Sequence, residues 1–152
     1  MKVLQNLLFV ASPEKVSAML VNPDFAKFVG VEVGATGFEA TQVEGGLTSR
    51  YQISTPRKAS GILGPDLIVD ETVTWESPTQ GRLLLTVEGV PAKVDGALSL
   101  SPSPTGCTAM YDADFKVKIP IIGKKIEQLA GEYLTKIVAA CETVGNRWLT
   151  SH

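Results

Sequence analysis

Glu71 is the residue of this sequence best placed for proton chemistry. It falls in an apparent strand over residues 67–75, where alternation puts it on one face with Val69, Val73 and Trp75. A carboxylate on such an apolar face loses hydration, which raises its pKa and suits it to act as an acid or a base. Two other interpretations stay open: a bulge turns Glu71 to solvent, or Glu71 pairs with Arg50 or another strand cation.

Three tyrosines are candidates to bind a ligand together with this carboxylate. Tyr51, Tyr111 and Tyr133 fall on apolar faces of predicted elements. There, a hydroxyl could point into a cavity and hydrogen-bond a ligand carbonyl or hydroxyl. The alternative is that all three are ordinary core tyrosines, whose hydroxyls reach backbone groups or water.

The sequence lacks the residues that most other catalytic mechanisms and metal sites require. His152, at the C-terminus, is the only histidine, which excludes a Ser-His-Asp triad. Cys107 and Cys141 are the only cysteines, and we expect neither a metal site nor a cofactor. The sequence has no Gly-rich phosphate loop, CxxC or HExxH motif. We expect both thiols to be buried and free in a reducing cytoplasm, with one disulfide as the alternative.

The composition indicates one folded domain over residues 1–152. Hydrophobic residues make up 44% and charged residues 20% of the chain, which excludes disorder. With 14 Lys and Arg against 16 Asp and Glu, the net charge is −2, so no broad basic face is available for nucleic acid. The N-terminal apolar run resembles a signal peptide, but Gln5 and Asn6 interrupt it, and a first strand over residues 3–10 is preferred.

The elements follow the order strand, two short helices, about six strands and one long helix. Ser12-Pro13-Glu14 begins a helix over residues 13–21, and Asn22-Pro23-Asp24 begins a second helix that we expect to end at Gly30. The last helix carries an apolar arc wide enough to lie across a concave sheet. The predicted later elements are strands over 31–44, 47–54, 67–75, 83–88, 94–100 and 109–119 and a helix over 124–149.

Residues 55–65 are predicted to form an exposed loop. Two basic residues, Arg57 and Lys58, lie there beside Ile62 and Leu63. This composition fits a mobile lid or a membrane-touching loop at a cavity mouth, and it equally fits a solvated surface loop.

Segregated helices without βαβ units indicate an α+β fold and exclude Rossmann and TIM-barrel architectures. We predict a curved antiparallel sheet of about six to seven strands, with two short helices after the first strand and a long C-terminal helix across the sheet. A lipocalin-like barrel with a terminal helix is the alternative. The two helices between the first strands argue against that barrel.

This layout resembles the helix-grip fold of the START/Bet v 1-like superfamily, also called SRPBCC or polyketide cyclase-like proteins. The stretch FKVKIPIIGKKIE, from Phe115 to Glu127, is similar to the strand-to-helix junction of a mostly actinobacterial domain-of-unknown-function branch. Trp148-Leu149 near the end of the last helix fits the same branch. The resemblance implies a cavity between sheet and helix, and it supplies no catalytic residues to carry over.

Three functions follow from these observations. The first is binding or transport of an apolar small molecule of lipid, polyketide or isoprenoid type, without catalysis. The second is a cyclase- or dehydratase-type enzyme that uses Glu71 with a tyrosine, and the third is a co-chaperone-like protein-binding module. A cavity of several hundred Å³ favours the first two, whereas a filled core favours the third. A buried Glu71 that faces a tyrosine hydroxyl favours the enzyme.

The predicted ligand-binding wall combines the apolar faces of the sheet and the last helix. Its members are Tyr51, Val69, Glu71, Val73, Trp75, Leu85, Leu98, Tyr111, Ala113, Phe115, Tyr133, Leu134, Ile137 and Val138. Besides the apolar ligand we expect no nucleic-acid partner and no transmembrane segment. The sequence allows a monomer or a homodimer.

Overall fold

A single antiparallel sheet joins the first strand of the chain to the last. The computed structural model describes residues 1–152, and its seven strands lie in the order β1-β7-β6-β5-β4-β3-β2. The strands are β1 (Lys2–Phe9), β2 (Thr36–Val43), β3 (Gly46–Ser54), β4 (Asp66–Ser77), β5 (Gln80–Val87), β6 (Val90–Ser103) and β7 (Gly106–Val117). The predicted antiparallel sheet is confirmed.

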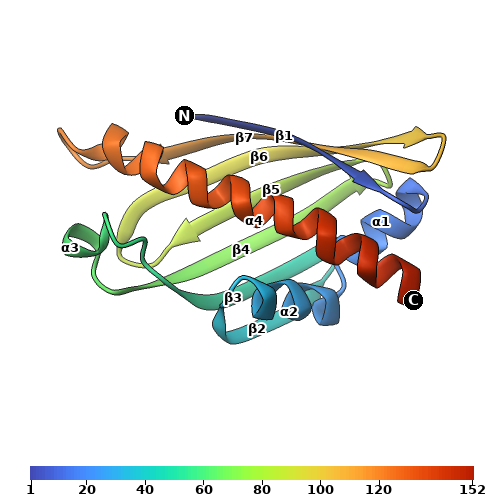
Figure 1. Ribbon diagram of the computed structural model, residues 1–152, viewed down its shortest axis with the longest axis horizontal. Helices are drawn as coiled ribbons and strands as arrows, with labels where there is room; N and C mark the ends of the chain where they lie inside the picture. The colour runs from blue at the N-terminus through green and yellow to red at the C-terminus, as the bar shows by residue number, and fades with distance from the viewer.

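Four helices accompany this sheet: α1 (Pro13–Leu20), α2 (Pro23–Glu32), α3 (Ser60–Leu63) and α4 (Gly123–Ser151). The long helix α4 runs diagonally across the strands, and α2 lies beside β2 and β3 (Figure 1). The two predicted helix starts are present, since the Ser12 hydroxyl accepts a hydrogen bond from the Lys15 N–H and the Asn22 side chain accepts one from the Asp24 N–H. None of the helices combines the length and apolarity needed to span a bilayer.

The interior contains two apolar clusters along α4. The larger one gathers Phe9, Val16 and Met19 against Val144 near the end of the helix. The smaller one gathers Val94, Phe115 and Val117 against Ile126 near its start. The candidate site lies between them, beneath the middle of α4.

The edge strand β1 is covered by side chains of α4. The Glu142 carboxylate accepts a hydrogen bond from the Leu8 N–H at 2.8 Å. Asn146 accepts one from the Val10 N–H at 2.9 Å and donates one to the Leu8 carbonyl at 2.8 Å. These contacts occupy backbone groups that a bare edge would leave free to pair with another chain.

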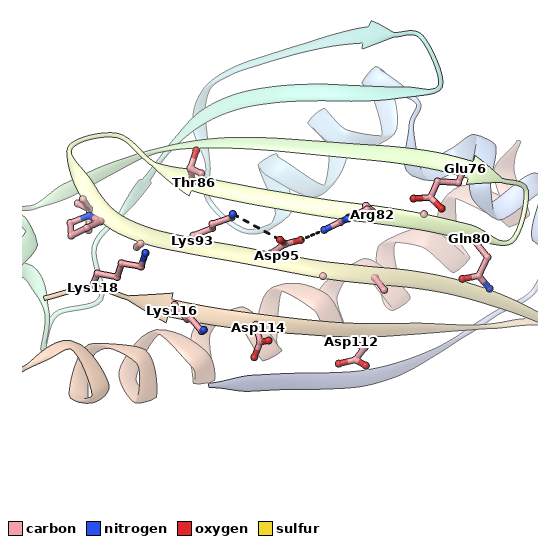
Figure 2. Close-up of a pocket in the computed structure, with 16 residues that line it drawn as sticks. Glu76, Gln80, Arg82, Thr86, Lys93, Asp95, Asp112, Asp114, Lys116 and Lys118 are labelled. Carbon is pink, nitrogen blue, oxygen red and sulfur yellow. Dashed lines mark hydrogen bonds and ion pairs between the residues drawn. The ribbon is translucent and has the colours of Figure 1, made fainter.

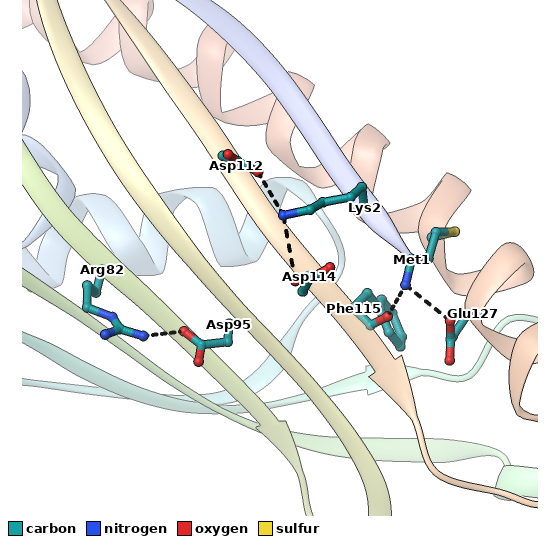
Figure 3. A network of polar contacts seen from close by, with 8 residues as sticks. All are labelled: Met1, Lys2, Arg82, Asp95, Asp112, Asp114, Phe115 and Glu127. Atoms are coloured by element: carbon teal, nitrogen blue, oxygen red, sulfur yellow. Dashed lines mark hydrogen bonds and ion pairs between the residues drawn. The ribbon is translucent and has the colours of Figure 1, made fainter.

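The N-terminus is tied down at the other end of the same edge. The Met1 ammonium group donates hydrogen bonds to the Phe115 carbonyl at 2.7 Å and to the Glu127 carboxylate at 3.2 Å (Figure 3). Glu127 also accepts a bond from the Val117 N–H at 3.1 Å. Through Glu127, α4 is therefore held to the N-terminus and to β7.

The predicted strand over residues 31–44 is wrong at its start, because α2 continues through Gly30 to Glu32. Gly30 packs in the helix, where a Cβ would lie 2.7 Å from the Phe38 ring. The helix ends instead with Gly34 at φ 81°, and the Ala35 N–H donates to the Gly30 carbonyl at 2.8 Å. This is a Schellman ending, which favours glycine at the left-handed position.

Two further expectations concern the middle of the chain and the thiols. The predicted loop over residues 55–65 contains the short helix α3, anchored by the buried side chain of Ala59. Cys107 and Cys141 are free, with Cys107 fully buried and Cys141 half-buried.

Candidate functional site

A cavity of about 160 Å³ lies between the sheet and α4. Of the 23 residues that line it, 20 are hydrophobic. Strands β3 to β7 form its floor, α4 forms its roof, and α2 with Phe38 of β2 closes one side. The wall is thus almost wholly apolar, as is usual for small-molecule sites.

Most of the predicted wall comes together around this cavity. The residues that line it are Tyr51, Glu71, Val73, Leu85, Leu98, Tyr111, Ala113, Leu134, Ile137 and Val138. Val69, Trp75, Phe115 and Tyr133 do not line it. Phe115 instead belongs to the small cluster with Ile126, and Trp75 packs against the large cluster. Strand parity identifies the correct face, whereas position along the strand decides which residue reaches the cavity.

Sequence reasoning missed the contribution of α2. Phe25 and Val29 of α2, and Val33 directly after its end, are spaced four residues apart and line the cavity. Phe28, three residues after Phe25, is exposed instead. The periodicity of the helix was available in the sequence, and it would have selected the correct stripe once α2 was extended past Gly30.

Glu71 faces the cavity and is bound to a tyrosine. The Tyr51 hydroxyl donates a hydrogen bond to Glu71 Oε2 at 2.9 Å. Burial raises the pKa of the Glu71 carboxyl, and the Tyr51 hydrogen bond offsets this only in part. Burial, followed by the nearby Glu71 charge, raises the pKa of Tyr51. The Phe38 ring stacks on Tyr51 at 5.2 Å between centroids, which fixes the tyrosine beside the carboxylate.

The interpretation that Glu71 pairs with Arg50 is wrong. Arg50 points to the opposite face of the sheet, where its guanidinium lies 2.9 Å from Asp70 and 2.9 Å from Glu88. In the register of β3 and β4, Arg50 is opposite Asp70 and Ser49 is opposite Glu71. The one-residue offset sends the cation outward and the carboxylate inward.

Three more polar groups share this part of the wall: Ser49, Tyr111 and Cys141. Burial raises the pKa of the Cys141 thiol to about 12, with a further contribution from the Glu71 charge. Burial also raises the pKa of Tyr111, and Cys141 and Glu71 add to the effect. The cavity therefore has one polar patch, with Glu71 at its centre, in an apolar wall. No three His, Cys, Asp or Glu side chains are arranged to hold a metal ion.

A larger hollow, of about 890 Å³, lies on the outer face of the sheet. Figure 2 shows its charged lining, in which Arg82 lies 2.8 Å from Asp95 and Lys93 lies 3.9 Å from the same carboxylate. This hollow is open to solvent, and two of its cations, Arg82 and Lys93, already lie against Asp95. The inner cavity is less open and has an almost wholly apolar lining, so it is the better candidate site.

The segment of residues 55–65 contributes no residue to the cavity wall. Its Leu63 packs instead against the small apolar cluster, while Ile62 is exposed. The proposed lid therefore has no contact with the cavity in this conformation.

A family model described as "Protein of unknown function (DUF2505)" matches residues 6–149. Two curated relatives, the uncharacterized proteins Rv0481c of Mycobacterium tuberculosis and Mb0491c of Mycobacterium bovis, are each 29% identical over 93 residues. That match covers 57% of this chain and 53% of each relative. The chain thus spans about half the length of the curated relatives it matches.

Solved structures with the same fold have low sequence identity. TTHA0849 from Thermus thermophilus superposes with a TM-score of 0.68 at 15% identity, covering 95% of this chain and 96% of that one. A START superfamily protein from Mycobacterium smegmatis gives 0.62 at 20%, covering 93% and 94%. Ara h 8.0201 gives 0.65 at 13%, covering 100% and 99%. The fold is a START/Bet v 1-like helix-grip fold, as predicted.

Proposed function

The chain belongs to the DUF2505 family, and we propose that it binds a small apolar molecule in the cavity beneath α4, without transforming it. One observation carries this proposal: a cavity with 20 hydrophobic lining residues between the sheet and α4. The cavity also argues against the protein-binding module, which a filled core would favour.

The cavity volume limits the ligand. At about 160 Å³ the cavity is smaller than the several hundred Å³ set above as favouring a small-molecule function, and smaller than the roughly 300–1,000 Å³ of drug-sized sites. An apolar protein cavity of about 150 Å³ holds one benzene molecule. The proposed ligand is therefore compact, of one or two rings or a short chain. A lipid, polyketide or isoprenoid would require the walls to move apart.

The polar patch indicates that the ligand has one polar group. Glu71 uses Oε2 to accept the Tyr51 hydrogen bond, which leaves Oε1 for a ligand N–H or O–H. The Tyr111 hydroxyl, which also lines the cavity, can donate to a ligand oxygen. An apolar body with one hydroxyl, amine or ring N–H satisfies both parts of the wall.

The test uses indole, a compact apolar molecule with one N–H, and calorimetry. We expect saturable binding at one site in the folded protein. Val138→Trp should abolish it, because Val138 lines the cavity beneath α4. Ala139→Trp is the matched control, since Ala139 is exposed on the same helix, and it should leave binding unchanged within about two-fold. Equal binding by both variants, or no binding by the native protein, refutes a ligand site in this cavity.

Indene, which has the shape of indole without its N–H, tests the polar part of the proposal. We expect it to bind about five- to ten-fold more weakly than indole, since a net hydrogen bond contributes about 1 kcal/mol. In Glu71→Ala the difference between indole and indene should disappear.

A second candidate function is favoured by the Tyr51–Glu71 hydrogen bond. A desolvated carboxylate with a raised pKa, held by a tyrosine at 2.9 Å, has the components of an acid–base pair. In a cyclase- or dehydratase-type reaction, Glu71 would take a proton from the substrate while a tyrosine hydroxyl donates a hydrogen bond to an oxygen of the substrate.

The two free thiols support our proposal that this protein works in a reducing cytoplasm.

A further inference from the structure

One end of the molecule brings together two segments that are distant in sequence. The segment that carries α3 and the turn from β7 into α4 both lie at the left end in Figure 1. Leu63 from the first segment and Ile119 and Ile122 from the second pack against the same apolar cluster. Residues 55–66 and 118–125 are here called the cationic tip.

The tip concentrates the positive charge of the protein. It holds five Lys and Arg residues and one acidic residue, Asp66, so its net charge is +4 while that of the whole chain is −2. The remainder of the chain accordingly has a net charge of −6. The five cations are Arg57, Lys58, Lys118, Lys124 and Lys125, all exposed and none in an ion pair.

Glu88 and Glu127, two acids outside the tip, are already engaged. Glu88, on the turn between β5 and β6, lies 2.9 Å from Arg50. Glu127 is bound to the Met1 ammonium and to the Val117 N–H. The Val117 N–H and then the N-terminus lower the pKa of Glu127, and Lys124 makes the smallest contribution, so both carboxylates interact mainly with groups outside the tip.

An isoleucine projects from the middle of this charge. Ile121 is fully exposed (102%) and is the only residue other than glycine with a positive φ, at 73°. A β-branched residue is strained in this region of backbone space. Ile62 of α3, at 53%, is the second exposed isoleucine of the tip. Strain that holds an apolar side chain in water has no benefit for the isolated fold, and it suggests a partner.

We propose that the cationic tip docks the protein on membranes that contain anionic lipids, with Ile121 and Ile62 entering the lipid interface. Exposed apolar residues ringed by lysines match the two attractions of such a surface, which offers negative headgroups and an apolar layer beneath them. An acidic protein would need both a set of carboxylates and a matching apolar pocket for Ile121, whereas an anionic membrane offers both over its whole surface. This docking is independent of the proposed ligand: the tip contributes no residue to the cavity wall.

The test is co-sedimentation with vesicles of equal parts phosphatidylcholine and phosphatidylglycerol, compared with pure phosphatidylcholine. We expect binding only to the anionic vesicles, weakened by added salt. Lys124→Glu/Lys125→Glu should weaken it at least about ten-fold. Lys15→Glu/Lys27→Glu makes the same charge change at two exposed lysines of α1 and α2, and it should bind as the native protein does.

Ile121→Gly tests the apolar contact without endangering the fold, because glycine adopts a positive φ without strain. We expect this variant to unfold at the same or a higher temperature. Its affinity for the anionic vesicles should fall by at least about five-fold. If it binds as tightly as the native protein, the tip recognises negative charge alone, as on an acidic protein, and the proposal is wrong. Equal binding to both vesicle types, or by the Lys124→Glu/Lys125→Glu variant, overturns it too. Val138→Trp should bind vesicles normally, which separates docking from the cavity.

Discussion

Glu71 is a residue whose environment opposes its charge. It has no cation beside it, since Arg50 is directed to the other face of the sheet. Its hydrogen-bond partner within the protein is the neutral Tyr51 hydroxyl. An ionised carboxylate there has lost hydration without gaining a counter-ion, which is why burial dominates its pKa.

This environment predicts a pH dependence of stability. The folded-state pKa of Glu71 is raised above its ordinary value of 4.5. Its contribution to stability is therefore fully present below about pH 4.5 and is lost as the pH rises through the folded pKa. Glu71→Gln cannot ionise, so we expect it to gain stability relative to the native protein between pH 4 and pH 8. The gain should be about 1.4 kcal/mol for each pH unit that separates the folded and unfolded pKa values of Glu71.

Urea unfolding at both pH values measures this difference, with Glu76→Gln, on an exposed residue of the same strand, as control. If the free energies of unfolding of the native protein and of Glu71→Gln changed with pH in parallel, the raised pKa of Glu71 would be contradicted. NMR titration of the Glu71 side chain then separates the two candidate functions. A midpoint near neutrality favours the acid–base enzyme, whereas a midpoint near 4.5 removes its only candidate base.

The polar side of this site was only partly readable from sequence. Alternation correctly put Tyr51 and Glu71 on inward faces, because a strand has a strict two-residue period. The same alternation puts Arg50, which precedes Tyr51, on the outward face and so argues against the Arg50 pair. It gave no register between β3 and β4, so it left open which inward residue of β3 Glu71 would meet. That choice depends on which residues face each other across strands, which a single strand's sequence does not specify.

At the scale of elements, α4 is positioned by polar contacts at both ends and by apolar contacts between them. Glu127 binds the N-terminus and Val117 near its start, and Asn146 binds β1 near its end. The helix is thereby fixed as a roof over the cavity. The middle of the roof needs no close contact with the floor, which is where the cavity lies.

Asn146→Ala should destabilise the protein by about 1–2 kcal/mol. The change removes both the 2.9 Å bond from the Val10 N–H and the 2.8 Å bond to the Leu8 carbonyl, and each exposed bond contributes about 1 kcal/mol or less. Thr143→Ala, one turn earlier at an exposed position, should change stability by less than about 0.5 kcal/mol. Denaturant unfolding compares the two, and equal effects would mean that Asn146 does not hold the edge of β1.

The sequence predicted the long elements well and the junction after α2 poorly. The last strand and last helix have many repeats of their period, so their faces are well determined. The segment from Gly30 to Thr36 has two candidate stop glycines, and the choice between them depends on Phe38, which packs against Gly30. Such a contact between neighbouring elements is absent from local propensity, which explains the misplaced boundary.

At the scale of the molecule, the cavity separates two parts of the core. The large cluster packs the end of α4 onto α1, α2 and β7, and the small cluster packs the start of α4 onto β6 and β7. Val94 and Leu98, from different clusters, both line the cavity between them. A ligand in the cavity therefore contacts both parts and replaces packing that neither part provides alone.

Indole should accordingly stabilise the whole domain. At a free concentration 100 times its Kd, a ligand that binds only the folded state adds about 2.7 kcal/mol to the free energy of unfolding. For a domain of this size that corresponds to a rise in Tm of about 5–10 °C. The Ala139→Trp variant should show the same rise, and Val138→Trp should show none, since its indole side chain occupies the site permanently. Differential scanning calorimetry measures the shift. A rise in Tm of equal size in Val138→Trp would show that indole binds outside the cavity. A second unfolding transition whose temperature indole does not change would show that the bound indole does not stabilise both clusters together.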